Sequence, residues 1–339
     1  YEALHHLYGL QPKEDKIGFP LFYFFQPQVV VFFKGDQLII EGDEAQSIAE
    51  SIIGTPPLPQ KRLLSLLIQP RLSKQVYIQT IEQLQQHIKR GDCYEINFCQ
   101  EFFAEGADIE PAQVFQSLVE TSPNPFAAFY RVHHQYLICA SPERFLTKKK
   151  NKLLSQPIKG TAPRGSDEAE DERLKKELLA SKKERAENVM VVDLVRNDLS
   201  KVCKEGSVQV DELFGIYSFP RVHQMISTIS GELKEELSFS HIIEATFPMG
   251  SMTGAPKQRV MQLIDQYESG SRGIFSGSVG YITPDGDFDF NVVIRSIMYN
   301  AATQYLSYQT GSGITFYSNA AQEWEECLWK GAAIKKVLT

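Results

Sequence analysis

Alternating apolar and polar residues predict short strands along much of the chain, and turn-forming residues join them in pairs. Three hairpins follow from this pattern: one within residues 18–42, one with arms at 135–147 and 152–158, and one with arms at 274–283 and 288–299. The last pair is joined by Pro284-Asp285-Gly286-Asp287, a sequence typical of tight turns. A further strand is predicted over 96–103.

Other apolar residues recur at helical spacing. Between Ile78 and Ile88 they are three or four residues apart, and Gly91 follows as a stop, which predicts an amphipathic helix over about 75–90. The same signals predict helices at 166–199, 238–246, 256–268 and 321–336. Hairpins outnumber strand-helix-strand units, so we expect an α+β fold in which mainly antiparallel sheets pack together with helices on the outside.

Composition narrows the function classes. The chain has 339 residues, of which 42% are hydrophobic, so it can bury a large core. Its net charge of −7 argues against nucleic acid or an anionic membrane as the main partner and favours a small molecule or a protein. Five cysteines without a C-x-x-C pair favour neither disulfides nor zinc, and a reducing cytoplasm is expected. No apolar run reaches the length of a membrane span.

Two couples of carboxylates are the first candidate site. Glu184 and Glu187 are three residues apart in one predicted helix, as are Glu323 and Glu326 in the last one, so each couple shares a helix face. A cation between the two helices would turn their mutual repulsion into ligation, and all-oxygen ligands suit Mg²⁺. Each couple taken alone is equally explained as a solvated helix face.

The second hairpin carries an acid and an amine. Glu143 and Lys159 are equidistant from Asn151 at the centre of the turn. A symmetric register would place them opposite each other with Cβ atoms ~5 Å apart. The alternative is an ion pair on a wet surface, and a slip of one residue would send the two side chains to opposite faces.

Three further features suit an anionic ligand. The loop Gly250–Lys257, which contains Thr253, runs into a predicted helix and offers free N–H groups, although its glycine spacing is not that of a P-loop. Gly311 and Gly313 form a second backbone-accessible loop, which a plain turn also explains. Arg295 is predicted in a strand, where it would either grip a carboxylate or face solvent. His223 fits a core histidine as well as a ligand contact.

These segments, in this order, resemble the chorismate-binding enzymes, whose members include anthranilate, aminodeoxychorismate, isochorismate and salicylate synthases. The resemblance is carried by Ser141–Phe145, Pro157–Gly165, Lys183–Asn188, Asp193–Leu199, Gly250–Lys257, Gly280-Tyr281, Ile294–Ser296, Gly311–Ile314 and the final Glu323, Glu326 and Lys330. It covers residues 76–338, the expected catalytic core of a single domain 1–339 with a divergent part at 1–75. It implies the fold of anthranilate synthase component I.

Within the family, Lys159 looks like the lysine typical of aminodeoxychorismate synthases. The resemblance implies that Lys159 attacks the chorismate ring and that Glu143 protonates the departing ring hydroxyl. Ammonia then displaces the lysine and gives 4-amino-4-deoxychorismate, in the para-aminobenzoate branch of folate biosynthesis. An anthranilate synthase component and, from another class, a non-catalytic chorismate-binding regulatory subunit are the alternatives.

The resemblance also assigns the remaining residues. Glu187 and Glu326 would touch Mg²⁺ directly, and Glu184 and Glu323 would act through water. Substrate contacts are expected from Gly160, Thr161, His223, Thr253, Tyr281, Arg295, Gly311, Gly313 and Lys330. Glu95 stands where related amination enzymes often carry Gln and water-adding members carry Lys, which disfavours an isochorismate or salicylate product.

The source of nitrogen is the last expectation. No cysteine lies in a G-x-C-x-G setting with a histidine partner following, so the sequence contains no plausible glutaminase. Free ammonia or a separate glutamine amidotransferase subunit is therefore expected to supply the amino group.

Overall fold

The structure is a computed structural model that describes residues 1–10, 13–58 and 65–339. It divides into two compact units, one formed by Tyr1–Phe19 with Leu64–Thr339 and the other by Pro20–Leu63. The smaller unit holds the hairpin predicted around the turn at 34–36, with strands β1 (Val30–Lys34) and β2 (Gln37–Glu41), followed by helix α1 (Ala45–Gly54). The division between a divergent part at 1–75 and a catalytic core at 76–338 rests on the family resemblance, and it stays a prediction.

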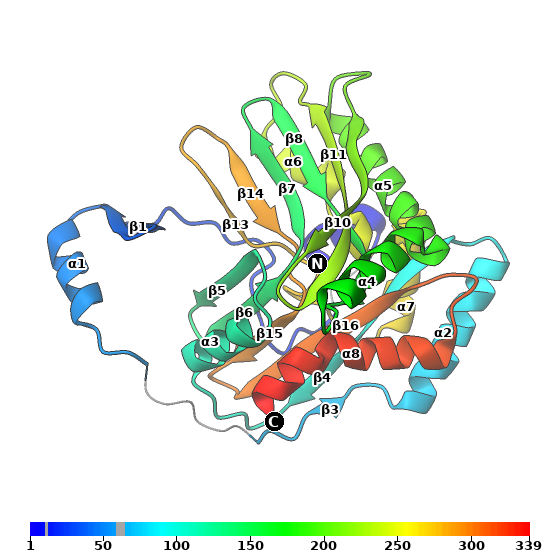
Figure 1. Ribbon diagram of the computed structural model, residues 1–339, viewed down its shortest axis with the longest axis horizontal. Coiled ribbons are helices and arrows are strands. Elements are labelled where there is room, and N and C mark those ends of the chain that lie inside the picture. The colour runs from blue at the N-terminus through cyan, green and yellow to red at the C-terminus, as the bar shows by residue number, and fades with distance from the viewer. Residues whose placement is uncertain (11–12, 59–64) are drawn as a thin grey trace. The chain divides into compact units, whose positions relative to one another are not determined.

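The larger unit contains two seven-stranded sheets (Figure 1). The first sheet has the strand order β10-β11-β8-β7-β14-β13, and β9 also pairs with β11. Its strands are β7 (Arg144–Lys149), β8 (Lys152–Gln156), β9 (Ile158–Pro163), β10 (Gln209–Ser218), β11 (Val222–Glu232), β13 (Gly280–Ile282) and β14 (Phe288–Asn291). The second sheet has the strand order β12-β4-β16-β15-β6-β5, and β3 also pairs with β4. Its strands are β3 (Gln69–Pro70), β4 (Glu95–Ala104), β5 (Phe126–Val132), β6 (Gln135–Ser141), β12 (Gly254–Ala255), β15 (Ser296–Asn300) and β16 (Tyr305–Ile314). Every pairing among the described strands is antiparallel, as predicted.

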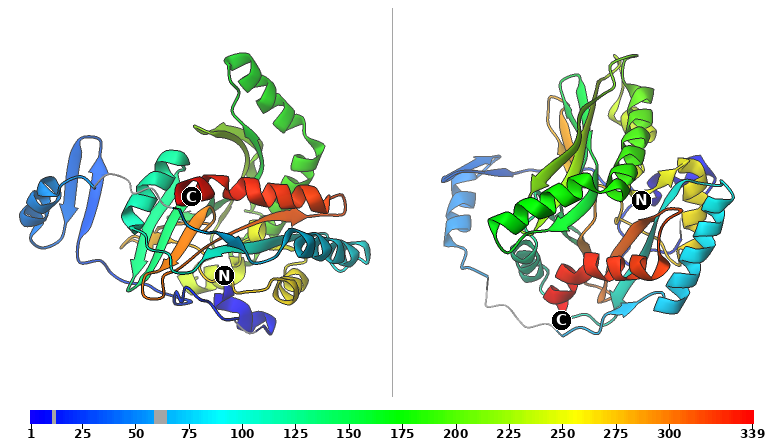
Figure 2. Two further views of the ribbon diagram at one scale, coloured as in Figure 1. Left: turned by 90° about the horizontal axis from the view of Figure 1, so that it is seen from below. Right: turned by 45° about the vertical axis from the view of Figure 1, so that its right-hand side comes forward.

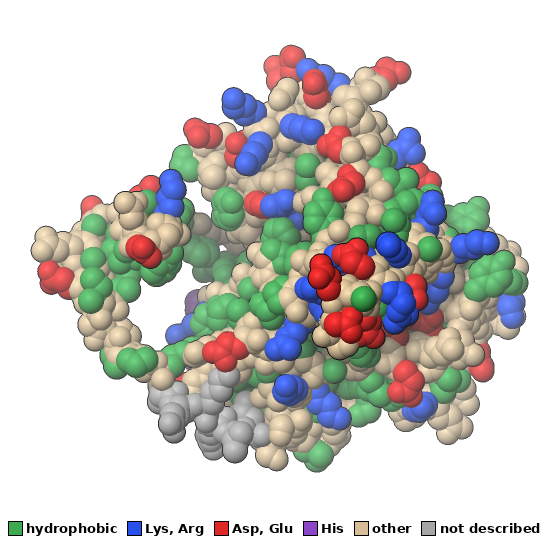
Figure 3. Space-filling view, viewed as in Figure 1, with side chains coloured by type: hydrophobic (Ala, Val, Ile, Leu, Met, Phe, Trp, Pro, Cys, Tyr) green, Lys and Arg blue, Asp and Glu red, His purple; other side chains and the backbone are tan. Residues whose placement is uncertain are grey.

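Seven α-helices surround these sheets in the described part of the larger unit: α2 (Lys74–Lys89), α3 (Pro111–Thr121), α4 (Glu168–Ala180), α5 (Lys182–Val202), α6 (Phe239–Thr246), α7 (Lys257–Tyr267) and α8 (Ala320–Leu338). Short 3₁₀ helices lie at Glu2–Tyr8 and Gly250–Met252. Figure 2 shows α8 lying across the second sheet, and α3 and α2 lie beside α8. Acidic and basic side chains stand side by side over α4 (Figure 3). No helix of the described residues is long and apolar enough to traverse a bilayer.

Three apolar clusters hold the layers together. The largest joins buried residues of both sheets with α5 and α6, including Phe145, Leu153, Val195, Leu137 and Met298. A second cluster packs α3 and α8 onto the second sheet, and a third packs α2 and α7 against β4. Burial of this kind contributes ~25 cal/mol per Å² of apolar surface, so these faces fix how the helices lie on the sheets.

Two predicted strands are broken where the chain crosses between the sheets. The arm predicted at 135–147 is β6 in the second sheet and β7 in the first, separated by Pro142 and Glu143. Pro142 has no N–H for a ladder, which explains the break at this point. The arm predicted at 288–299 likewise divides into β14 and β15, and only 280–282 of the arm predicted at 274–283 is a strand.

The long helix predicted over 166–199 is also divided. Ser181 ends α4 and caps α5, because its hydroxyl accepts a hydrogen bond from the Glu184 N–H at 3.3 Å. This cap places Glu184 in the first turn of α5. The helices predicted near 238–246, 256–268 and 321–336 are present as α6, α7 and α8.

Candidate active site

Glu143 lies where the chain leaves the second sheet and enters the first. Its backbone carbonyl accepts a hydrogen bond from the N–H of Val292 at 3.0 Å, beside the second crossing between the sheets. The side chain is buried, with 4% of the residue exposed. Burial raises the pKa of Glu143 to about 7, and the nearby ammonium of Lys159 only partly opposes that shift. Near neutral pH this carboxyl group can therefore carry and donate a proton.

Lys159 lies on β9 and forms a buried ion pair that the sequence does not reveal. Its Nζ donates to Oε1 of Glu95, the first residue of β4, at 2.7 Å. Burial disfavours its ammonium form, but the carboxylates around it, that of Glu95 first, outweigh burial and raise the pKa of Lys159 above its ordinary value. The nucleophile expected from the sequence is thus protonated at rest.

The cross-strand register predicted for Glu143 and Lys159 is wrong. Arg144 pairs with Gln156 in the hairpin of β7 and β8, so Glu143 precedes the ladder, and β9 pairs with β11 instead. A register shift in β7–β8 and the break at Pro157 account for the difference. The two buried side chains nevertheless interact electrostatically, and each influences the pKa of the other.

Two glycines allow the backbone to approach these groups closely. A Cβ on Gly313 would stand 2.4 Å from Oε1 of Glu95 and 3.0 Å from Nζ of Lys159. Gly160 has φ +100° and would bring a Cβ to 3.1 Å from Oε2 of Glu184. Side chains at these positions would displace the charged groups of the site.

The four glutamates of the carboxylate couples converge from α5 and α8. Lys183 interacts electrostatically with all four carboxylates. Burial disfavours its ammonium form, but these carboxylates outweigh burial and raise the pKa of Lys183. Burial raises the pKa of Glu187 to about 7 and also raises that of Glu184. Glu326 is the exception, because the ammonium of Lys330, at 2.7 Å, outweighs burial and holds its pKa below the usual range. The prediction that each couple shares a helix face is confirmed.

The donor set is suited to a hard cation. Oε1 of Glu187 and Oε2 of Glu323 are buried and form no hydrogen bond. Oε1 of Glu187 lies 3.9 Å from Nζ of Lys183, beyond hydrogen-bond distance. Buried carboxylate oxygens without a hydrogen bond are costly unless a cation or a donor reaches them. Across the described residues, however, no three His, Cys, Asp or Glu side chains stand close enough together to enclose a metal ion. The oxygen chemistry of these side chains suits Mg²⁺, although the described residues do not form a closed metal site.

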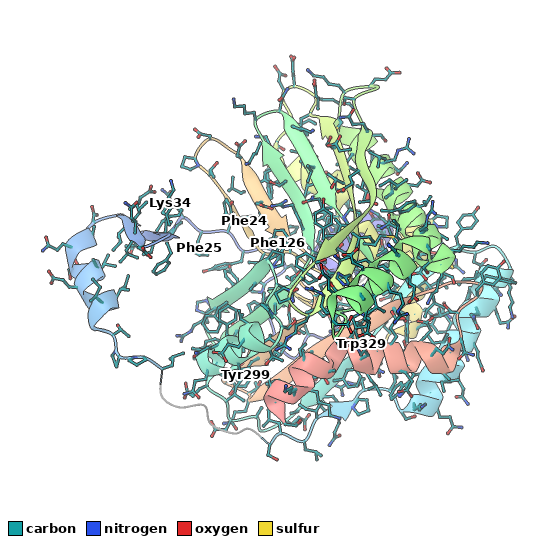
Figure 4. The ribbon with its side chains drawn as sticks, viewed as in Figure 1. Phe24, Phe25, Lys34, Phe126, Tyr299 and Trp329 are labelled. Carbon is teal, nitrogen blue, oxygen red and sulfur yellow. The ribbon has the colours of Figure 1, made fainter. Side chains whose placement is uncertain are left out.

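A basic group borders the carboxylates on α8. Nζ of Lys330 donates to the carbonyl of Gly311 at 2.8 Å, and the guanidinium of Arg295 donates to the backbone carbonyl of Lys330 at 2.5 Å. Arg295 also lies over the ring of Trp329, which projects from α8 (Figure 4). Burial lowers the pKa of Arg295 to about 10. The strand predicted for Arg295 is wrong, since it lies between β14 and β15 with φ +52°.

Four other residues were predicted to contact the substrate, and the structure places each of them differently. Thr161 is on β9 and pairs with Gln224, and the buried Thr253 hydroxyl donates to the carbonyl of Met249 at 3.1 Å. Tyr281 is on the edge strand β13 and is 63% exposed, so its side chain is not enclosed with the others. His223 is fully buried and lies 2.9 Å from both Ser218 and Asp171.

The loop Gly250–Lys257 does not present a free lysine to an anion. Nζ of Lys257 donates to Oδ2 of Asp198 at 2.5 Å, and Pro256 occupies the N-cap position of α7. Sequence reasoning missed this pair and the pair of Glu95 with Lys159. Glu95 precedes a predicted strand and Asp198 lies in a predicted helix, and only the tertiary fold brings a lysine to each of them.

Comparison with known proteins gives a consistent result. The model of the chorismate binding enzyme family matches residues 1–336. The chain is 38% identical over 270 residues to aminodeoxychorismate synthase component 1 of Escherichia coli, which covers 80% of this chain and 59% of that protein. It is 34% identical over 338 residues to an anthranilate synthase component I-like protein of Synechocystis, covering 96% of this chain and 68% of that protein. The chain thus spans less than two thirds of the E. coli relative.

Solved structures show the same architecture. The crystal structure of anthranilate synthase component I from Streptococcus pneumoniae superposes with a TM-score of 0.87 at 28% identity, over 100% of this chain and 78% of that one. The α+β fold predicted from the sequence, with antiparallel sheets and outer helices, is confirmed by this likeness and by the strand pairings.

Proposed function

The chain belongs to the family of chorismate binding enzymes, and from this membership we propose that it aminates chorismate with ammonia to 4-amino-4-deoxychorismate. The observation that carries the proposal is the buried lysine, Lys159, which interacts electrostatically with the buried carboxyl group of Glu143, whose pKa burial raises to about 7. A nucleophile and a proton donor in one dry site suit displacement of a hydroxyl group. Relatives named aminodeoxychorismate synthase support the same reaction.

The reaction divides into two displacements. Once Lys159 has lost its resting proton, its neutral amine bonds to the ring, and the ring hydroxyl leaves as water with the proton of Glu143. Ammonia then bonds to the ring and expels the lysine, and the new ammonium returns a proton to Glu143. Chorismate and ammonia thus give 4-amino-4-deoxychorismate and water, and both residues end as they began.

The acidic cluster would hold Mg²⁺ through Glu187 and Glu326, with Glu184 and Glu323 acting through water. When bound, Mg²⁺ would neutralise and orient a carboxylate of the substrate. Arg295 and Lys330 would border the substrate on the α8 side, and Gly311, Gly313 and Gly160 would leave room for it.

Replacing Glu187 by Gln should weaken Mg²⁺ binding by about tenfold or more, because it removes a charge from the ion's surroundings. The readouts are a calorimetric Mg²⁺ titration and the Mg²⁺ concentration that gives half-maximal activity. Asp193→Asn on the same helix is the control, since Asp193 is exposed and pairs with Arg196. Full activity of chelator-treated protein would show the metal assignment to be wrong.

We also propose that a glutamine amidotransferase subunit delivers ammonia to this chain. The chain's five cysteines are buried, and burial raises the pKa of each thiol, so none has the character of a reactive nucleophile. These unpaired thiols also suit a reducing cytoplasm.

The nitrogen source tests the proposed function. The 339-residue chain, given chorismate and Mg²⁺, should form the aminated product with ammonium at alkaline pH, where free ammonia is present, and none with glutamine. Product is identified by chromatography and mass spectrometry. Glutamine-dependent turnover by the pure chain would contradict the need for a partner.

The alternative function is anthranilate synthesis, which the similarity to anthranilate synthase component I also supports. That reaction uses no lysine nucleophile, so the role of Lys159 separates the two. A regulatory subunit without catalysis is disfavoured, because the acid, the amine and the four glutamates are all present.

A further inference from the structure

Glu95 is a buried carboxylate that none of the proposed steps uses. The residue is 2% exposed, its Oε1 accepts from Lys159 at 2.7 Å, and its Oε2 is buried without a hydrogen-bond partner. The contact is tightly enclosed, since a Cβ on Gly313 would strike both members of the pair. The Glu95 carboxylate therefore forms its one hydrogen bond among the described residues with the amine of Lys159.

The proposed nucleophile must lose a proton before it can attack. Lys159 is 11% exposed at its side chain, so solvent has little access to its ammonium. The other carboxyl groups that interact electrostatically with Lys159 are Glu143 before β7, Glu184 and Glu187 on α5, and Glu326 on α8. Lys183 and Lys330 act on these glutamates in turn. Among the described residues, Glu95 is the carboxylate that hydrogen-bonds Nζ of Lys159.

We propose that Glu95 is the proton acceptor of Lys159: it takes the ammonium proton across their hydrogen bond when the amine bonds to the ring, and returns it when the lysine leaves. This inference rests on the proposed function and deepens it. The transfer turns an ion pair into two neutral groups and leaves the proton count of the site unchanged. Glu143 is not the acceptor, because it must already hold a proton to release the ring hydroxyl as water.

The steps balance with Glu95 included. Lys159 gives its proton to Glu95, and the neutral amine displaces the hydroxyl, which leaves as water with the proton of Glu143. Ammonia displaces the lysine as a neutral amine, which takes its proton back from Glu95. The ammonium formed on the ring returns a proton to Glu143.

The test is the pH dependence of the covalent step in a single turnover without ammonia, quenched in acid and followed by the mass of the protein. The wild-type rate should be flat below pH about 7, since no proton enters or leaves the site, and should fall above it as Glu143 ionises. Glu95→Gln keeps the shape of the side chain but cannot accept a proton. Its lysine must lose the proton to solvent, so the rate should rise about tenfold per pH unit on the acidic side.

At pH 6 we expect Glu95→Gln to form the adduct at least 100-fold more slowly than wild type, with the gap narrowing as the pH rises. Glu95→Asp keeps an acceptor and should show the flat wild-type profile at a lower rate. Glu101→Gln is the matched control, because Glu101 lies on the same strand in an ion pair with Arg71 at 2.7 Å, and its profile should not change.

A Glu95→Gln protein with the wild-type rate and profile would overturn the inference, as would a rising limb in Glu95→Asp equal to that of Glu95→Gln. Chorismate binding and thermal unfolding of each variant show whether the fold is intact. If wild-type protein forms no adduct at all, the nucleophilic role of Lys159 fails, and the role of Glu95 fails with it.

Discussion

Replacing Lys159 by alanine is expected to lower aminodeoxychorismate formation on the order of 10³-fold or more, because it removes the group that bonds to the ring. Any remaining turnover would come from direct attack by ammonia and should therefore rise in proportion to the ammonia concentration. The measurement is steady-state product formation with ammonium as the nitrogen source. Lys159→Ala should also release Glu95 from its ion pair, so binding of chorismate is measured separately.

Two variants show whether the charge of Lys159 or its amine matters. Lys159→Arg keeps a cation beside Glu95 but should restore nothing, since a guanidinium stays protonated and cannot attack. Lys152→Ala removes a lysine of the neighbouring strand β8 that pairs with Asp211 at 3.2 Å, and it should leave the rate unchanged. Near-normal synthesis by Lys159→Ala would reduce this residue to a partner of the acidic groups.

Glu143→Gln is the second change with a large expected effect. An amide of the same shape cannot protonate the departing hydroxyl, and loss of a general acid typically costs 10²–10⁴-fold in rate. Because burial raises the pKa of Glu143 to about 7, its acid form is present below that pH and is lost above it. The wild-type rate of adduct formation should accordingly fall above pH 7, and this limb should be absent from the variant.

The pH profile of Glu143→Gln is what separates a proton donor from a structural residue. Loss of a merely structural group would lower the rate equally at every pH. A variant that keeps the limb near pH 7 would move the assignment to another acid, and Glu187, whose pKa burial also raises to about 7, would be the next candidate.

Local patterns explain which parts of the fold the sequence predicts. The helices bearing Glu187 and Glu326 follow from periodicity, and the spacing within each couple follows from helix geometry. The antiparallel class follows from the turns. These three predictions do not require knowing which distant segments of the chain contact one another.

The failures fall where the chain changes sheets. Glu143 and Arg295 were predicted inside single strands, yet each lies at a crossing between the first and the second sheet. Alternation of apolar residues continues through such a crossing, because both sheets bury residues there. The ion pair of Glu95 with Lys159 joins strands 64 residues apart, and no local pattern encodes that contact.

The covalent bond between the ring and Lys159 is the central claim, and its direct test is the mass of the protein quenched during turnover with chorismate and Mg²⁺ but no ammonia. The account predicts an added mass equal to chorismate less one water, located on the peptide that carries Lys159 and absent from Lys159→Ala and Glu143→Gln. An unmodified Lys159 in wild-type protein that nevertheless aminates chorismate when ammonium is added, or that releases anthranilate, would contradict it.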